Sequence, residues 1–296
     1  MAAMKTILVR YGELALKSEP VRRDFEHTLA RNIRRSLEKG GVKADVKRIF
    51  GRVLVEAKNS GKAAEILKKT FGVVSFSVCA ETISGIKDIE KASIEVFRCA
   101  RPKKTNTFRV ETNRVGSHPY SSKQVNEAVG RAIAEKFRLK VNLTEPDKTL
   151  YIDIRDRQAF IFTEKTPGPG GFPAGVQGRV LYVAEDRNGL LSAWLMMKRG
   201  AVPVLFFAGI GKKTAKKYAC LLEEWNAGHK IRYYVDIKRN ADCKRINKTA
   251  EQERCLGIIS GRAEIMGKNS FKLPVFYPLI GFISKEIKEK IKSIFG

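Results

Sequence analysis

The sequence predicts an α/β protein whose last third is a parallel sheet covered by helices. Two observations predict this class. Short apolar runs of strand length alternate with segments of helical periodicity along the 296 residues, and residues 179–200 join a strand, a tight turn and a helix. Here Val180–Ala184 reads as a buried strand, Asp186–Gly189 as the turn and Leu190–Arg199 as the helix. This geometry places a helix N-terminus where it can bind phosphate.

The length of the chain is sufficient for two or three domains. A stretch rich in proline and glycine, residues 165–178, is the predicted boundary before the parallel sheet. We therefore expect an N-terminal domain over residues 1–75, a second over 76–166 and a third over 176–296.

The first domain predicts a β-α-β-β-α-β order, which is the ferredoxin-like pattern. Its strands are expected at 6–9, 42–49, 52–57 and 73–79, and its helices at 20–38 and 62–69. In the first helix, apolar residues four apart predict the buried stripe Val21, Phe25, Leu29, Ile33 and Leu37. Arginines occupy the other faces of this helix: Arg22, Arg31, Arg34 and Arg35. They form either a solvated face or a contact for a phosphate backbone.

The second domain continues the alternation. A helix is expected at 86–97 and a strand at 107–112, and Ser121 with Gln124 three residues later predicts a capping box that opens a second helix. The apolar face of that helix is Val125, Val129, Ala132, Ile133 and Phe137. Strands at 150–155 and 159–163 are expected to form a hairpin whose polar side chains face outward.

Charge indicates the class of partner. The net charge is +26, and it is spread as +9 over residues 1–75, +5 over 76–175 and +12 over 176–296. This spread favours one extended polyanion, such as a nucleic acid, over a small anion. A basic or thermophilic proteome is the alternative explanation.

Other classes are excluded by composition. The sequence has no apolar run of 18 residues and no secretory signal, so we expect a cytoplasmic protein with no membrane partner. Its five cysteines include no C-x-x-C pair and it has three histidines, which predicts free thiols and no metal site. Residues 209–214 do not form a P-loop, because Phe206 stands at the position of the first glycine and Lys213 replaces Ser/Thr.

Several segments resemble one family. GPGGFPAGVQG at 168–178, SAWLMMKRG at 192–200 and PVFYPLIGFISKEI at 274–287 resemble the tRNA 4-thiouridine synthetases, a sulfurtransferase family shared with thiamine biosynthesis. TFRVETNRVGSHPYSSKQVNEAVGRAI at 107–133, followed by YIDIR, resembles a THUMP domain. The resemblance implies a THUMP α/β domain after the ferredoxin-like one. It also implies a C-terminal PP-loop domain with the adenine-nucleotide-hydrolase-like, Rossmann-like fold.

The THUMP resemblance implies RNA-facing residues and a partner. Carried over by position, the RNA-facing residues are Arg109, Arg114, Ser121, Ser122 and Lys123. The family implies tRNA as partner, lying across a homodimer. His118 and Tyr120, in the loop before the helix, either pack the loop or stack on a base.

The phosphate-binding turn departs from the family. The family sequence Ser-Gly-Gly-x-Asp-Ser wraps the pyrophosphate of ATP, but residues 184–189 read Ala-Glu-Asp-Arg-Asn-Gly. Each carboxylate placed about 4 Å from a phosphate costs roughly 1–4 kcal/mol. We therefore predict a vestigial nucleotide pocket made of Val183, Ala184, Glu185, Asp186, Asn188, Gly189, Phe206, Arg245 and Gly261. No cofactor is expected, except ATP if the altered loop still binds it.

Three hypotheses follow. The first is a tRNA-binding protein of this family without ordinary adenylation, which assists an intact sulfurtransferase paralogue or a sulfur donor. The second is an active tRNA sulfurtransferase in which Cys243, before the basic pair Lys244-Arg245, carries the sulfur. The third is a structural subunit of a modification complex. Cys243 could equally be a half-buried structural cysteine.

Overall fold

The structure is a computed structural model and describes residues 5–12, 18–49, 51–236, 242–265 and 271–296. The chain divides into two compact units that alternate along the sequence. The first unit contains residues 1–10, 42–64 and 75–167, and the second contains residues 11–41, 65–74 and 168–296. The helix α2 (Ser60–Leu67) crosses from one unit to the other.

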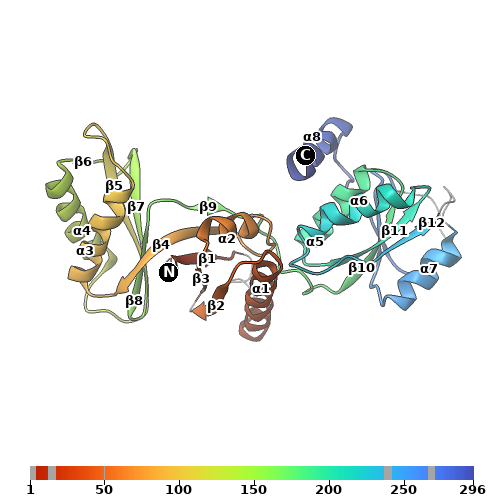
Figure 1. Cartoon of the computed structure of the whole chain (residues 1–296), viewed down its shortest axis with the longest axis horizontal. Helices are drawn as coiled ribbons and strands as arrows, with labels where there is room; N and C mark the ends of the chain where they lie inside the picture. The colour runs from red at the N-terminus through yellow and green to blue at the C-terminus, as the bar shows by residue number, and fades with distance from the viewer. Residues whose placement is uncertain (1–4, 13–17, 50, 237–241, 266–270) are drawn as a thin grey trace. The chain divides into compact units, whose positions relative to one another are not determined.

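A nine-stranded sheet runs through the first unit, and its long strand β4 (Ser75–Ile83) joins two halves (Figure 1). The other strands are β1 (Lys5–Arg10), β2 (Ala44–Ile49), β3 (Arg52–Ala57), β5 (Thr107–Val115), β6 (Lys140–Val141), β7 (Lys148–Arg155), β8 (Gln158–Phe162) and β9 (Thr166–Pro167). Their order is β2-β3-β1-β4-β8-β7-β5-β6, with β9 beside β4. Residues 75–79 of β4 pair with β1, and residues 80–83 pair with β8. The predicted strand 73–79 is therefore displaced and too short, because its second half forms part of the next sheet region.

Two helices cover one face of the strands β5, β7 and β8 (Figure 1). They are α3 (Ile86–Cys99) and α4 (Ser122–Phe137), and Ile89, Phe97 and Val129 are among the residues fully buried between helices and sheet. The predicted capping box is confirmed. The Ser121 Oγ accepts a hydrogen bond from the Gln124 amide at 3.2 Å, and Gln124 Oε1 accepts one from the Ser121 amide at 2.7 Å.

The hairpin β7–β8 is confirmed, but its predicted outward polar face is wrong. Leu8 and Leu54, from β1 and β3, form a buried cluster with Phe160 and Phe162 of β8. Because the first half of the sheet packs on this face, Asp153 on β7 is buried as well. Both faces of the hairpin are therefore covered within the first unit.

The helix α1 (Glu19–Lys39) belongs to the second unit. Its buried stripe is shorter than predicted. Leu29, Ile33 and Leu37 are buried. Phe25 is half-buried and Val21 is 39% exposed, and the first two turns of the helix contain no fully buried residue. The Phe25 ring packs edge-on against Phe172 at 5.7 Å between centroids.

The second unit contains the predicted parallel sheet, with strand order β12-β11-β10-β13-β14 and every pairing parallel. The strands are β10 (Arg179–Ala184), β11 (Val202–Ala208), β12 (Tyr233–Asp236), β13 (Ile258–Ser260) and β14 (Val275–Phe276). The helices α5 (Asn188–Lys198), α6 (Lys212–Glu223) and α8 (Ser284–Phe295) pack into the core on one face, and α7 (Cys243–Gln252) covers the other (Figure 1). The sequence predicts a strand over residues 231–237 and a helix over 240–256, and residues 237–241, where the two meet, lie outside the described residues.

Among the described residues, no helix is both long and apolar enough to cross a membrane.

Candidate functional site

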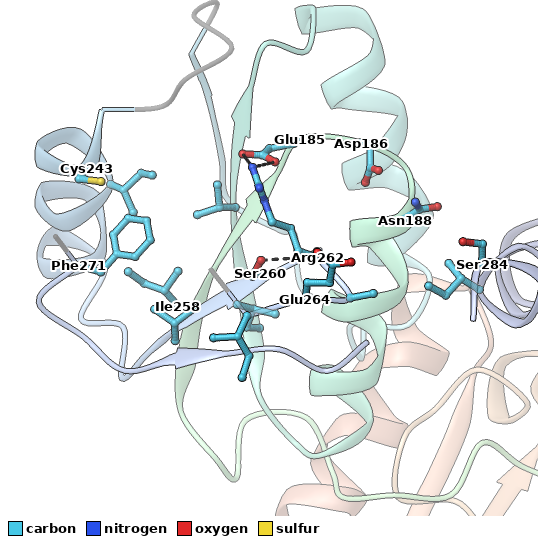
Figure 2. Close-up of a pocket in the computed structure, with 18 residues that line it drawn as sticks. Glu185, Asp186, Asn188, Cys243, Ile258, Ser260, Arg262, Glu264, Phe271 and Ser284 are labelled. Atoms are coloured by element: carbon cyan, nitrogen blue, oxygen red, sulfur yellow. Dashed lines mark hydrogen bonds and ion pairs between the residues drawn. The ribbon is translucent and has the colours of Figure 1, made fainter. Parts of the chain in front are cut away.

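A cavity of about 670 Å³ lies at the carboxyl ends of β10 and β13 in the second unit (Figure 2). This is the edge of a parallel sheet where ligands bind in open α/β folds. The polar lining residues are Glu185, Asp186, Asn188, Ser260, Arg262, Glu264 and Ser284, together with the thiol of Cys243. The apolar lining residues are Val183, Ile246, Ile258, Ile259, Ile265, Phe271, Val275 and Ile287. The cavity therefore offers an apolar surface large enough for a ring system beside an acidic loop.

The two carboxylates of the altered loop, Glu185 and Asp186, both have partners within the chain, and Figure 2 shows the one between Glu185 and Arg262. Glu185 accepts from Arg262 Nη2 at 3.0 and 3.3 Å. Asp186 Oδ1 accepts from the Gly189 amide at 3.2 Å. That amide lies in the first turn of α5, where unpaired N–H groups would otherwise face an anion. A carboxylate of the chain thus accepts a hydrogen bond from one amide at the N-terminus of this helix.

Gly189 and Gly261 are required by close packing on Tyr182, which lies beneath the loop. A Cβ at Gly189 would lie 1.1 Å from Tyr182 Oη, and one at Gly261 would lie 2.8 Å from Gly189 Cα. The Tyr182 hydroxyl is buried and has no hydrogen-bond partner among the described residues. Burial, with Asp186 and Glu185 nearby, raises the pKa of Tyr182 well above its ordinary value, so the phenol stays neutral.

Of the nine residues predicted for the nucleotide pocket, five line the cavity: Val183, Glu185, Asp186, Asn188 and Gly261. Ala184 and Phe206 are instead buried in the two cores of the sheet, and Gly189 is buried against Tyr182. Arg245 projects from α7, and its Nη1 donates to Asp236 Oδ2 at 2.7 Å.

Cys243 lines the same cavity from the first residue of α7. It is half-buried and lies on the same side of the cavity as Phe271 (Figure 2). Asp242 caps this helix by accepting from the Lys244 amide at 2.9 Å. The cysteine predicted as a sulfur carrier and the altered loop therefore face one cavity.

Arg262 is the site residue whose role the sequence did not predict. It bridges the loops after β10 and β13, because its side chain pairs with Glu185 and its amide donates to Ser260 Oγ at 3.2 Å. The sequence signal that could have predicted this pair is that opposite charges, Glu185 and Arg262, lie in loops that follow two adjacent parallel strands. Within the described residues, no cluster of histidine, cysteine and carboxylate side chains could hold a metal ion.

The residues predicted to face RNA lie in the first unit, at the start of α4 and on β5. Ser121 caps α4, Ser122 is its first residue, and the Lys123 side chain is 85% exposed. Arg109 donates to the Leu143 carbonyl at 3.3 Å, and Arg114 lies 3.3 Å from both the Gly116 carbonyl and His118 Nδ1.

The loop before α4 is held by its own rings. His118 Nε2 lies 2.6 Å from the Asp156 carbonyl, and the Tyr120 hydroxyl donates to the Ser84 carbonyl. The two rings also contact each other, at 5.4 Å between centroids. These contacts favour the loop-packing interpretation of both residues.

The four arginines predicted on α1 differ in exposure. Arg31 and Arg34 are exposed, whereas Arg22 and Arg35 are half-buried. Arg22 lies 3.9 Å from Glu26, and Arg35 contacts the ring of His229. Burial and the cations Arg35, Arg31 and Lys39 lower the pKa of His229.

Comparison with known families identifies the class of this chain. Residues 6–77 match the ThiI ferredoxin-like domain and residues 84–164 match the THUMP domain. The chain is therefore a THUMP protein with a ThiI-type N-terminal domain, as the resemblance predicted.

Curated relatives extend the likeness to the whole chain. A probable tRNA sulfurtransferase of Saccharolobus islandicus (strain L.S.2.15 / Lassen #1) is 32% identical, covering 98% of this chain and 86% of the relative. One from Methanobrevibacter smithii is 38% identical, covering 90% and 72%. The chain belongs to the tRNA sulfurtransferase family. The first alignment spans 329 positions, more than the 296 residues here, so the relative carries segments that this chain lacks.

Solved structures confirm the fold. The crystal structure of PH1313 from Pyrococcus horikoshii Ot3 has a TM-score of 0.85 at 29% identity, covering 98% of this chain and 99% of that one. A 4-thiouridine synthetase solved with RNA and ATP has a TM-score of 0.82 at 24% identity, covering 98% and 85%. The mixed α/β fold with a ferredoxin-like domain, a THUMP domain and a parallel sheet is thus confirmed.

Proposed function

We propose that this chain binds tRNA but does not carry out the ordinary ATP-dependent adenylation of the family. The contact between Asp186 and the Gly189 amide carries the proposal, because it fills the helix N-terminus with a carboxylate of the chain. A triphosphate would have to displace Asp186 and break the pair between Glu185 and Arg262. It would also meet two like charges, each worth roughly 1–4 kcal/mol at about 4 Å.

The proposed partner is tRNA because three features agree. The chain has a THUMP domain, two relatives carry the name probable tRNA sulfurtransferase, and the net charge of +26 is distributed over the whole sequence. Binding of a polyanion by many lysines and arginines releases counterions, so the affinity must fall as salt rises. A homodimer with tRNA lying across both subunits is part of the proposal.

Filter binding and calorimetry on the full chain test both halves. We expect retention of tRNA at 50 mM salt, with an affinity that falls steeply as salt rises. We expect no saturable heat when ATP is added, with or without tRNA. Retention that is absent at 50 mM salt, or indifferent to salt, would contradict tRNA binding, and saturable ATP binding would contradict the loss of the nucleotide site.

The second candidate is an active tRNA sulfurtransferase that works through Cys243. The observation that favours it is that Cys243 lines the same cavity as Glu185 and Asp186. If this candidate holds, tRNA stimulates pyrophosphate release from ATP. Cys243→Ser retains that release but loses sulfur incorporation, whereas Cys220→Ser, at an exposed cysteine of α6, retains both. Absence of ATP-dependent chemistry with every sulfur source tried would exclude it.

A further inference from the structure

Three arginines surround a single aspartate between the two halves of the sheet in the first unit. We call Arg10, Arg52, Arg155 and Asp153 the arginine cluster. Arg52 Nε and Nη2 donate to Asp153 Oδ2 at 3.1 and 3.0 Å, and Arg155 Nε donates to Oδ1 at 2.6 Å. Each oxygen of the carboxylate thus has an arginine partner. The side chains of Asp153 and Arg155 are only 4% and 6% exposed.

Arg10, the third arginine, shares this environment. Its Nη1 donates to Ser77 Oγ at 3.1 Å, and its guanidinium lies 4.5 Å from the centre of the Phe162 ring. Its Nη2 is buried and has no hydrogen-bond partner among the described residues. Burial, followed by the neighbouring charge of Arg52, lowers the pKa of Arg10 to about 10. The guanidinium therefore keeps its charge at neutral pH without a carboxylate of its own.

The positive charge of the cluster exceeds the negative charge that it contains. Cys79 does not balance it, because burial raises the pKa of this thiol to about 12 and keeps it neutral. Ser77 supplies a hydroxyl, which itself donates to the Glu164 carbonyl at 2.5 Å. A buried charge that lacks a counter-ion is costly, and natural proteins pair such charges. A tetrahedral oxyanion matches the planar fork of donors that arginine presents.

We propose that the arginine cluster binds a phosphate-type oxyanion, which accepts hydrogen bonds from Arg10 Nη2 and from the free guanidinium edge of Arg155. The cluster lies where β7 ends, next to the β2–β3 turn. Arg52 Nη1 donates to the Gly51 carbonyl at 2.8 Å, and a Cβ at Gly51 would lie 3.8 Å from Arg155 Nη1. The donors themselves are oriented by the bonds from Arg10 Nη1 to Ser77 Oγ and from Arg155 Nε to Asp153 Oδ1.

The same end of β7 adjoins the end of β5 and the loop that leads from β5 to α4 in the THUMP domain. Arg155 is in register with Val115 of β5, and the Asp156 amide donates to the Val115 carbonyl at 3.2 Å. The end of β5, which carries Arg114, and the following loop with His118 therefore begin beside the cluster. The oxyanion is either a backbone phosphate of RNA or free phosphate, and the two sources share the same chemistry. The proposal goes beyond tRNA binding and does not depend on it, since free phosphate probes the site directly.

The first test uses inorganic phosphate and the full chain. Sodium phosphate is titrated against sodium chloride at constant ionic strength, with calorimetry for affinity and circular dichroism for the thermal midpoint. We expect saturable binding and a rise in midpoint for the wild type. Arg10→Met keeps an apolar stem over Phe162 but removes the guanidinium, so phosphate affinity falls by about tenfold or more, the scale of one charged hydrogen bond. Arg98→Met, at an exposed arginine paired with Glu95 in the same unit, keeps the wild-type response.

A second variant protects the test against misfolding. Arg10→Lys keeps the charge but loses the fork of donors, so its phosphate affinity is expected between those of the wild type and Arg10→Met. Without phosphate, Arg10→Met is expected to be at least as stable as the wild type, because it removes a half-buried charge that has no carboxylate of its own and whose Nη2 is buried without a partner among the described residues. Absence of saturable phosphate binding by the wild type would overturn the proposal. So would a loss of stability in Arg10→Met that is the same with and without phosphate, since the cluster would then be a purely structural ion-pair network.

The tRNA arm identifies the source of the anion. If RNA supplies the phosphate, Arg10→Met weakens tRNA binding, the slope of log affinity against log salt falls by about one, and phosphate competes with tRNA. If free phosphate is the ligand, the variant loses the phosphate response but binds tRNA like the wild type. Both outcomes support an oxyanion site. Failure of tRNA binding by the wild type would contradict the proposed function and leave the phosphate titration to decide this inference.

Discussion

The sequence resemblance predicts that Glu185 and Asp186 stand at the positions of two family glycines, and each has a partner inside the chain. The partners differ in kind. Glu185 pairs with a side chain, Arg262, whereas Asp186 accepts from the backbone amide of Gly189. Removal of the Glu185 carboxylate would leave the Arg262 guanidinium without this partner. Removal of the Asp186 carboxylate would leave the Gly189 amide, at the N-terminus of α5, without this acceptor. Both groups attract phosphate.

Restoring glycine at both positions should therefore restore affinity for ATP. We expect Glu185→Gly with Asp186→Gly to tighten ATP binding by about tenfold or more, because two repulsive contacts of roughly 1–4 kcal/mol disappear. Calorimetry measures the change. Glu264→Gly is the matched control, since it removes a carboxylate of the cavity lining without freeing the Gly189 amide. An unchanged affinity in the double variant would show that the altered loop is not what limits ATP binding.

The cysteines should differ in reactivity according to their burial. Burial raises the pKa of Cys79 to about 12 and that of Cys255 to about 11, so both remain thiols at pH 8. Cys99 and Cys220 are exposed. Iodoacetamide at pH 8, followed by mass spectrometry, should label Cys99 and Cys220 much faster than the half-buried Cys79 and the buried Cys255. Labelling of Cys79 at the rate of Cys99 in the folded protein would contradict this expectation.

Among the elements, α4 depends on a cap formed by side chains three residues apart. Ser121→Ala removes the acceptor for the Gln124 amide and should destabilise the first unit by about 1 kcal/mol. Thermal unfolding followed by circular dichroism measures the loss. Ser122→Ala, one position later and outside the capping box, should change stability by only a few tenths of that amount. Equal effects of the two substitutions would show that the cap contributes nothing specific.

In the second unit, Glu253 follows the last residue of α7, and its carboxylate is buried. It accepts from Tyr234 at 2.6 Å and from Arg232 at 3.0 and 3.1 Å. Burial alone would raise the pKa of Glu253, but the hydrogen bonds from Tyr234 and Arg232 outweigh burial and lower it. A carboxylate with a lowered pKa in the folded state stabilises the fold above its unfolded pKa of about 4.3. This contribution is lost as the pH falls through the folded pKa.

Glu253→Gln should accordingly be less stable than the wild type at pH 7, and the difference should shrink as the pH falls below about 4.3. Tryptophan fluorescence is the suitable probe, because Trp194 and Trp225, the two tryptophans of the sequence, both lie in this unit. Glu251→Gln, at an exposed neighbour on α7, should show no such dependence. A constant difference from pH 7 to pH 3 would contradict the assignment.

The elements that the sequence predicted well are those determined by residues close together in the sequence. The capping box at Ser121 needs residues three apart, and the parallel strands need short apolar runs. What could not be predicted depends on partners far along the chain. Arg262 and Glu185 are 77 residues apart, and Arg52 and Asp153 are 101 apart. For the same reason the sequence assigned Asp153 to an outward face, although strands from the beginning of the chain cover it.

On the scale of the whole molecule, the excess of positive charge affects stability and binding in opposite directions. Both units are basic, and if each of the 31 acidic residues paired with one of the 57 lysines and arginines, 26 of these cations would remain. A net charge far from zero destabilises a compact state through self-repulsion, and salt screens this repulsion over a Debye length of about 10 Å at 0.1 M. The same screening weakens attraction to a polyanion.

Sodium chloride should therefore stabilise the free protein while it weakens tRNA binding. Between about 20 mM and about 200 mM salt we expect the thermal midpoint of the free chain to rise, since the Debye length shortens across this range. Over the same range the logarithm of tRNA affinity should fall linearly with the logarithm of salt, by about 0.9 per phosphate neutralised. Circular dichroism and filter binding on one preparation measure both trends. A midpoint that falls with salt would mean that local ion pairs dominate stability, and tRNA affinity that is unchanged would mean that the charge serves no polyanion.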